Sequence, residues 1–62
     1  MKFKELRLSK GFKTAKELAI KAEINQWNIA KWETGKARPK FDTIKKLAKI
    51  LNVSVEDILN CF

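Results

Sequence analysis

The side chains able to do chemistry are few in this chain of 62 residues, and their types exclude most catalytic sites. There is no histidine and only one cysteine, Cys61, which excludes a Ser-His or Cys-His nucleophile pair. The His and Cys spacings that bind zinc are absent for the same reason. We therefore expect that this protein is not an enzyme and that it binds no metal and no cofactor. What remains is recognition through hydrogen bonds and charge.

Amide and cationic side chains gather in the middle of the chain. Side-chain amides and ammonium groups pair with the edges of bases and with phosphates. The residues in question are Asn25, Gln26, Asn28, Lys31, Lys36, Arg38 and Lys40.

The net charge of +7 is unevenly distributed along the chain. Residues 1–40 hold eleven basic and four acidic side chains, whereas residues 41–62 hold three of each. A one-sided basic domain with a pI near 9.9 is typical of a polyanion-binding protein. The alternative is a lysine-rich solvated surface. A membrane surface is less favoured, because the basic residues are spread over several short helices.

Length and hydropathy favour one small globular domain over residues 1–62. A chain this short buries only ~60% of its unfolded surface, so a partner subunit is expected to stabilise it. No apolar run approaches the ~18 residues of a membrane span, and the opening run MKFKELRLSK contains no signal-peptide core. We expect a cytoplasmic protein with no small-molecule ligand.

The positions of helix-capping and helix-ending residues, together with the spacing of apolar residues, predict five helices. Capping residues are expected at Thr14 (with Glu17), Asn25, Asp42 and Ser54 (with Asp57), and stops at Gly11, Gly35 and Asn52. Isolated helices shorter than ~12 residues are marginal in water, so these must pack into an all-α globule. The predicted ranges are about Lys2–Lys10, Ala15–Ala22, Gln26–Thr34, Thr43–Leu51 and Val55–Cys61.

The second and third helices are joined by the tight turn Glu23-Ile24-Asn25, which predicts a helix-turn-helix. The second helix of this motif enters the major groove of DNA. Ile29 is expected to face the core. The side chains expected to face away from it are Gln26, Trp27, Ala30, Lys31 and Thr34.

Four side chains of the third helix are predicted to contact bases. Gln26 suits adenine, Lys31 suits guanine or a phosphate, and Asn28 suits a base edge or the backbone. Trp27 would cover a thymine methyl or a sugar; alternatively it folds back over the domain or serves a protein contact.

A second set is predicted to contact phosphates, which positions a protein without selecting sequence. For Lys36, Arg38 and Lys40, the alternative is a solvated loop with no DNA contact. The set is Lys13, Thr14, Lys16, Asn25, Lys36, Arg38 and Lys40.

The runs LRLSKG, TAKELA, INQWNIAKWETGKARP and IKKLAKILNVSVEDIL resemble the Cro/repressor-type (XRE-like) helix-turn-helix family over about residues 3–59. The resemblance implies a five-helix, lambda-repressor-like fold that binds operator DNA as a symmetric dimer. It also implies an ion pair between Arg7 and Glu33. Three features depart from the family pattern: Ala15 stands in place of a glutamine, Lys13 is an extra residue, and Glu23 occupies a turn position often held by glycine.

The leading hypothesis is a sequence-specific regulator, of phage or mobile-element type, that occupies a palindromic operator as a homodimer. The rivals are an antitoxin-like protein-interaction module and a nonspecific nucleic-acid binder. The apolar C-terminal segment is the predicted dimer interface, unless Ile58 and Leu59 close the core and the end frays. The interface residues are Val53, Val55, Ile58, Leu59 and Phe62.

Overall fold

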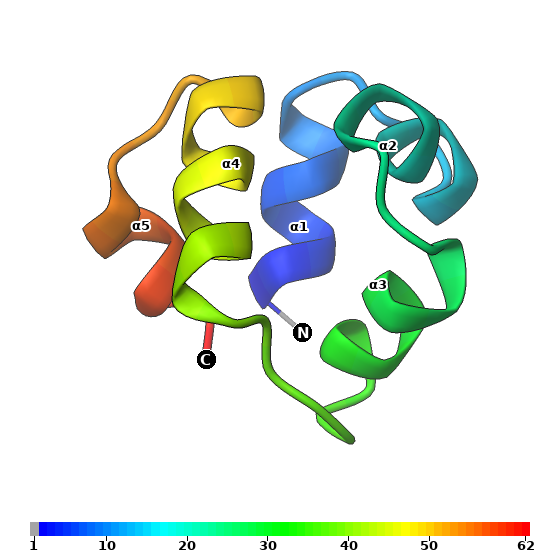
Figure 1. The fold of residues 1–62 in the computed structure, drawn as a ribbon. Coiled ribbons are helices and arrows are strands. Elements are labelled where there is room, and N and C mark those ends of the chain that lie inside the picture. The colour runs from blue at the N-terminus through cyan, green and yellow to red at the C-terminus, as the bar shows by residue number, and fades with distance from the viewer. Residues whose placement is uncertain (1) are drawn as a thin grey trace.

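The computed structural model describes residues 2–62, which form five helices with short connections (Figure 1). No strand occurs within that range, so the predicted all-α class is confirmed. In chain order the helices are α1 (Lys2–Ser9), α2 (Ala15–Ala22), α3 (Gln26–Glu33), α4 (Phe41–Leu51) and α5 (Val55–Leu59).

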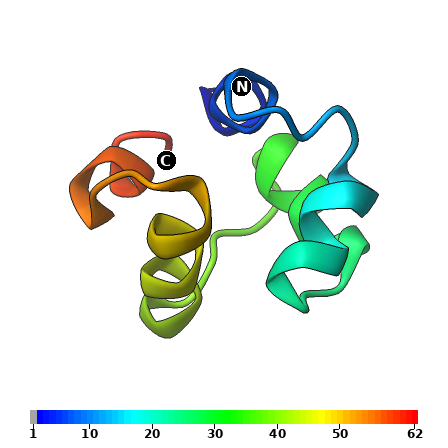
Figure 2. The same cartoon turned by 90° about the horizontal axis from the view of Figure 1, so that it is seen from above.

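Each helix contributes at least one fully buried side chain to a single core. Helix α2 packs against α3 and α4, α1 packs against α3, and α4 packs against α5. Viewed from above, α2 and α3 lie on one side of the molecule and α4 and α5 on the other (Figure 2). Because none of these short helices is stable alone, the shared core is what holds them. The fully buried residues are Phe3, Leu18, Ile29, Leu47, Leu51 and Ile58.

Aromatic rings tie the two ends of the chain to α3. The ring of Phe3 meets Trp32 edge-on, with centroids 5.9 Å apart, and stacks on Phe62 at 5.7 Å. Such pairs add ~0.5–1.5 kcal/mol beyond the burial of their area. The C-terminal Phe62 is therefore packed within its own chain. The alternative in which the last residues fray is wrong for this side chain.

Helices α1 to α4 all end in the same way, with a left-handed residue followed by an amide that reaches back to the last turn. After α2, for example, Ile24 N donates to the Ala19 carbonyl at 2.9 Å. The predicted stops at Gly11, Gly35 and Asn52 are confirmed. The left-handed residues are Gly11 (φ 90°), Glu23 (φ 57°), Gly35 (φ 79°) and Asn52 (φ 56°).

The residue that follows the left-handed position is apolar and partly buried after three of these helices, but it is a cation after α3. Phe12, Ile24 and Val53 follow α1, α2 and α4 and are partly buried against the core. After α3 the equivalent residue is Lys36, whose amide donates to the Lys31 carbonyl at 2.9 Å and whose side chain is exposed. An apolar contact normally accompanies this motif. The loop after α3 thus displays a cation where the other three loops bury an apolar group.

The helix starts differ from prediction in two places. Thr14 Oγ1 accepts from Glu17 N at 3.1 Å as expected, but the Glu17 carboxylate accepts from Lys13 N at 2.8 Å, not from Thr14. The predicted cap at Ser54 with Asp57 is confirmed: a full reciprocal capping box opens α5, and its two bonds measure 3.0 and 3.3 Å.

The predicted cap of α4 at Asp42 is wrong. The helix begins at Phe41, and Lys40 occupies the N-cap position without a side-chain bond. Ile44 N donates to the Lys40 carbonyl at 2.9 Å, which closes the first turn two residues early. The Lys45 ammonium lies 5.2 Å from the centroid of the Phe41 ring, one turn away. This pair favours the earlier start.

Replacing Glu23 with glycine is expected to stabilise the fold. An L-residue in left-handed geometry costs the folded state roughly 1–2 kcal/mol, which glycine avoids. Glycine loses more chain entropy on folding, but this costs only roughly 0.5–1 kcal/mol. We expect the free energy of unfolding in urea to rise by about 0.5–1 kcal/mol. The Glu23→Gln variant keeps the strain and should change stability by less than about 0.5 kcal/mol. Equal stabilisation by both variants would show that charge, rather than backbone strain, is responsible.

Candidate nucleic-acid interface

Helix α3 buries one face and exposes the opposite one. Ile29 is fully buried and Trp32 is 5% exposed. Trp27 and Lys31 lie about 160° from Ile29 around the helix, one on each side. Both are exposed, and Trp27 retains 66% of its accessible surface. The outward ridge of α3 is therefore an indole followed, one turn later, by an ammonium group.

Gln26 does not face fully away from the core, and that part of the prediction is wrong. It lies about 60° from Ile29 around the helix, because three residues make almost a full turn. Its side chain is half-buried, as is Ala30, whereas Asn28 is exposed on the opposite flank. Gln26 therefore lies at the edge of the outward face, and Trp27 lies at its middle.

The turn before α3 fixes where the outward face begins. Asn25 is in extended geometry, and its Oδ1 accepts from Trp27 N at 2.8 Å. The Asn25 amide nitrogen remains a donor at the helix start. Ile24 is half-buried against the core, which anchors the turn from inside.

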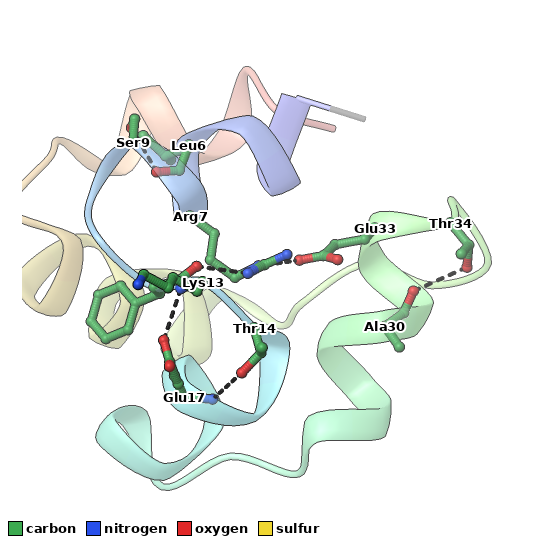
Figure 3. A network of polar contacts seen from close by, with 10 residues as sticks. Leu6, Arg7, Ser9, Lys13, Thr14, Glu17, Ala30, Glu33 and Thr34 are labelled. Carbon is green, nitrogen blue, oxygen red and sulfur yellow. Dashed lines mark hydrogen bonds and ion pairs between the residues drawn. The ribbon is translucent and has the colours of Figure 1, made fainter.

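A nearly buried ion pair locks the far end of α3 to α1 (Figure 3). Arg7 Nε donates to Glu33 Oε2 at 2.7 Å, and the two side chains are 4% and 13% exposed. Arg7 Nη1 also donates to the Phe12 carbonyl at 2.7 Å. One guanidinium thus joins α1, α3 and the loop before α2, which uses the fixed fork that lysine lacks.

The loop after α3 presents three cations around one buried proline. Lys36, Arg38 and Lys40 are exposed, whereas Pro39 is buried. The Lys36 and Ala37 amides both donate to the Lys31 carbonyl, at 2.9 and 3.3 Å. The loop is thereby folded back onto the end of α3, so its cations continue from Lys31.

The start of α2 is less open to an anion than its sequence indicates. Lys13, Thr14 and Lys16 are exposed. However, the Lys13 amide is already bonded to the Glu17 carboxylate, and Thr14 Oγ1 already accepts the Glu17 amide (Figure 3). A negative group therefore occupies part of this helix end. The ammonium groups of Lys13 and Lys16 and the Thr14 hydroxyl proton stay available.

The structure contradicts part of the predicted dimer interface. Ile58 is 0% exposed to solvent because it is buried in the core of its own chain, so it cannot meet a partner. Phe62 is engaged by Phe3. Val53 and Val55 are half-buried against the core, whereas Leu59 is 49% exposed. Of the five predicted residues, Leu59 has the most surface to offer.

Two further side chains have notable surroundings: Phe41 beside the cationic loop and Cys61 near the C-terminus. Phe41, at the start of α4, is 59% exposed beside the cationic loop and lies two residues before the predicted start of that helix. Burial, opposed by the nearby Lys2 ammonium, raises the pKa of the Cys61 thiol. Cys61 Sγ lies 3.4 Å from the Asp57 carbonyl and acts as a donor to it. The thiol is thus held in its neutral form.

Across residues 2–62, no cluster of three or more His, Cys, Asp or Glu side chains is placed to hold a metal ion. Over the same range, no helix has the length and apolar character needed to span a bilayer.

Comparison with known proteins identifies the family of this chain. A model of the helix-turn-helix family matches residues 3–58. The chain belongs to the Cro/repressor-type helix-turn-helix family. This helix-turn-helix domain is 30% identical over 59 residues to the HTH-type transcriptional activator BcrR of Enterococcus faecalis. The match covers 95% of this chain and 28% of that protein, so the domain spans less than a third of the relative's length. No solved structure gives a significant match.

Removing one member of the Arg7–Glu33 pair should strongly destabilise the helix-turn-helix domain. Glu33→Ala leaves a guanidinium buried without its partner, so we expect a loss of about 3–5 kcal/mol in urea unfolding. The double variant Arg7→Met/Glu33→Met should be more stable than the single variants Arg7→Met and Glu33→Met, because no uncompensated charge remains. Glu5→Ala, on the exposed side of α1, is the control and should change stability by less than about 0.5 kcal/mol. A double variant as unstable as the single ones would contradict this account.

Proposed function

We propose that this domain binds a specific double-stranded operator and regulates transcription by occupying it. The observation that carries the proposal is the outward face of α3. Trp27 and Lys31 project directly opposite the buried Ile29, and the cations of the following loop continue from them. The major groove is ~12 Å wide and admits a helix in this orientation.

The division of labour within the face supports specific binding over mere attraction to DNA. Gln26, Trp27, Asn28 and Lys31 lie on the first two turns of α3, from which base edges are contacted. Asn25, Lys36, Arg38 and Lys40 flank that face and would bind phosphates. Lys13, Thr14 and Lys16 would add a second phosphate contact through their side chains. Lys36 supports the loop's role most directly, because the same motif buries an apolar residue after α1, α2 and α4.

We propose that two copies bind together. The domain measures 23 × 23 × 20 Å. Adjacent turns of the major groove lie ~34 Å apart, so one copy cannot occupy both. A symmetric pair would bind a palindrome, with the exposed Leu59 on α5 as part of the contact between the copies. Such a protein would act on the nucleoid of a prokaryotic or phage-infected cell.

A protein-interaction module on the same scaffold is the second candidate. It is favoured by the exposed indole of Trp27, since tryptophan is enriched at the centres of protein interfaces. The relative from Enterococcus faecalis is named as a transcriptional activator, which supports DNA binding over this alternative.

Selection from a pool of random duplexes separates these candidates. We expect enrichment of a short palindrome whose half-sites are centred about 10 base pairs apart, one turn of the duplex. A duplex carrying a single half-site should bind much more weakly in a gel shift than the full palindrome. A pool that enriches no sequence would sink the proposal. Uniform binding would indicate a nonspecific binder, and absence of binding would indicate the interaction module.

Variants of one amide and one cation should fail in different ways. Gln26→Ala is expected to cost about 1–3 kcal/mol on the enriched site and to relax preference at one base pair. Lys36→Ala should weaken all sequences alike and reduce the slope of log K against log salt by about one. Lys49→Ala, in the last turn of α4, removes the same charge away from the proposed face and should leave the slope almost unchanged. Equal, sequence-independent losses from Gln26→Ala and Lys36→Ala would refute the assigned roles.

A further inference from the structure

Trp27 lies on the outward ridge of α3, and the described residues, 2–62, leave most of its indole uncovered. It is 66% exposed, whereas the other tryptophan, Trp32, is 5% exposed and meets the Phe3 ring edge-on. Within residues 2–62, the aromatic contacts involve Phe3, Trp32 and Phe62, and the cation–ring contact joins Lys45 to Phe41. The indole therefore has no stacking partner in this part of the chain, and its apolar surface is available to a ligand.

The place of Trp27 on α3 decides which part of a bound duplex it would meet. When a helix lies in the major groove, the middle of its outer face points to the floor of the groove and its two flanks point to the sugar-phosphate walls. Trp27 lies opposite Ile29 at the middle of that face, and Asn28 lies on a flank. It also belongs to the first turn of α3, the end of a recognition helix that contacts base edges. The indole is thus directed at bases rather than at sugars.

The floor of the major groove offers an apolar side chain one matching group. Each base pair presents hydrogen-bond donors and acceptors there, and the 5-methyl group of thymine is the apolar exception. Resting on this geometry and on the proposed operator binding, we infer that Trp27 recognises the 5-methyl group of a pyrimidine in each half-site. A cytosine methylated at carbon 5 carries the same group at the same place and is a second ligand of the same chemistry.

This contact is distinct from the contacts of its polar neighbours. Gln26 and Lys31 discriminate between bases by hydrogen bonds, which depend on the donor and acceptor pattern of the base. The indole of Trp27 responds to the methyl group whichever pyrimidine carries it. Operator recognition is then sensitive to a modification that leaves base pairing unchanged, and methylation of a cytosine at that position strengthens binding.

The test uses the enriched palindrome with its thymines replaced one position at a time by uracil, which pairs identically but lacks the methyl group. At one thymine in each half-site, the replacement should weaken binding about fourfold, as expected for one buried methyl group. Trp27→Ala should bind the thymine and uracil duplexes equally, whereas Trp27→Phe should retain part of the difference. Ile20→Ala removes an exposed apolar side chain that is 69% exposed on α2 and is the matched control, which should keep the full difference.

A second arm places cytosine or 5-methylcytosine at the position identified by uracil. The methylated duplex should bind about fourfold more tightly to the native domain and equally to Trp27→Ala. A specific site whose binding ignores every methyl group overturns the inference while the proposed function stands. A methyl effect that persists in Trp27→Ala also overturns it. If the random pool enriches no site, both the proposed function and this inference fail, because no defined base pair then faces Trp27.

Discussion

The structure depends on holding a two-turn helix by one side only. Helix α3 has eight residues, too few to persist in water by itself. Ile29 and Trp32 bury one face in the core, and Glu33 closes the far end against Arg7. All of these holding contacts fall within one half of the helix circumference, so Trp27 and Lys31 on the other half are left free. The exposed face of α3 is thus a direct consequence of how the helix is anchored.

Arg7 concentrates this anchoring in one side chain. A buried charge is expensive to desolvate, and replacing such a pair with apolar residues is often neutral or stabilising. Its geometry here gives what an apolar contact lacks, which is direction. Nε binds Glu33 on α3 and Nη1 binds the Phe12 carbonyl in the loop leading to α2. The same guanidinium therefore holds α3 and the loop that leads into α2. This fixes the rotation of α3 about its axis and hence the direction in which Trp27 points.

The sequence predicted those elements whose signals are local. Helix ends at Gly11, Gly35 and Asn52 follow from backbone preferences of single residues, and the five helices follow from apolar spacing. The errors arose where a distant or competing contact decides. Asp42 was a plausible cap, but the Phe41–Lys45 contact and the Lys40 carbonyl start α4 earlier. Apolar spacing marks Ile58 as buried without indicating whether its cover is the same chain or a second copy. Gln26 stands first in α3, but the helical turn carries it to the edge of the outward face.

Exposure alone does not single out Trp27. Each helix carries one large apolar side chain that is well exposed: Leu8, Ile20, Trp27, Phe41 and Leu59. Isolated exposed apolar residues are normal in proteins, and a domain of this size has too little core to bury them all. Trp27 differs in its surroundings. It lies on a helix whose opposite face is held by an ion pair. It is followed by Lys31 and then by a loop that exposes Lys36, where the loops after α1, α2 and α4 bury an apolar group. An apolar group at the centre of a positively charged face matches a partner that is anionic at its edges and carries methyl groups within, as the major groove does.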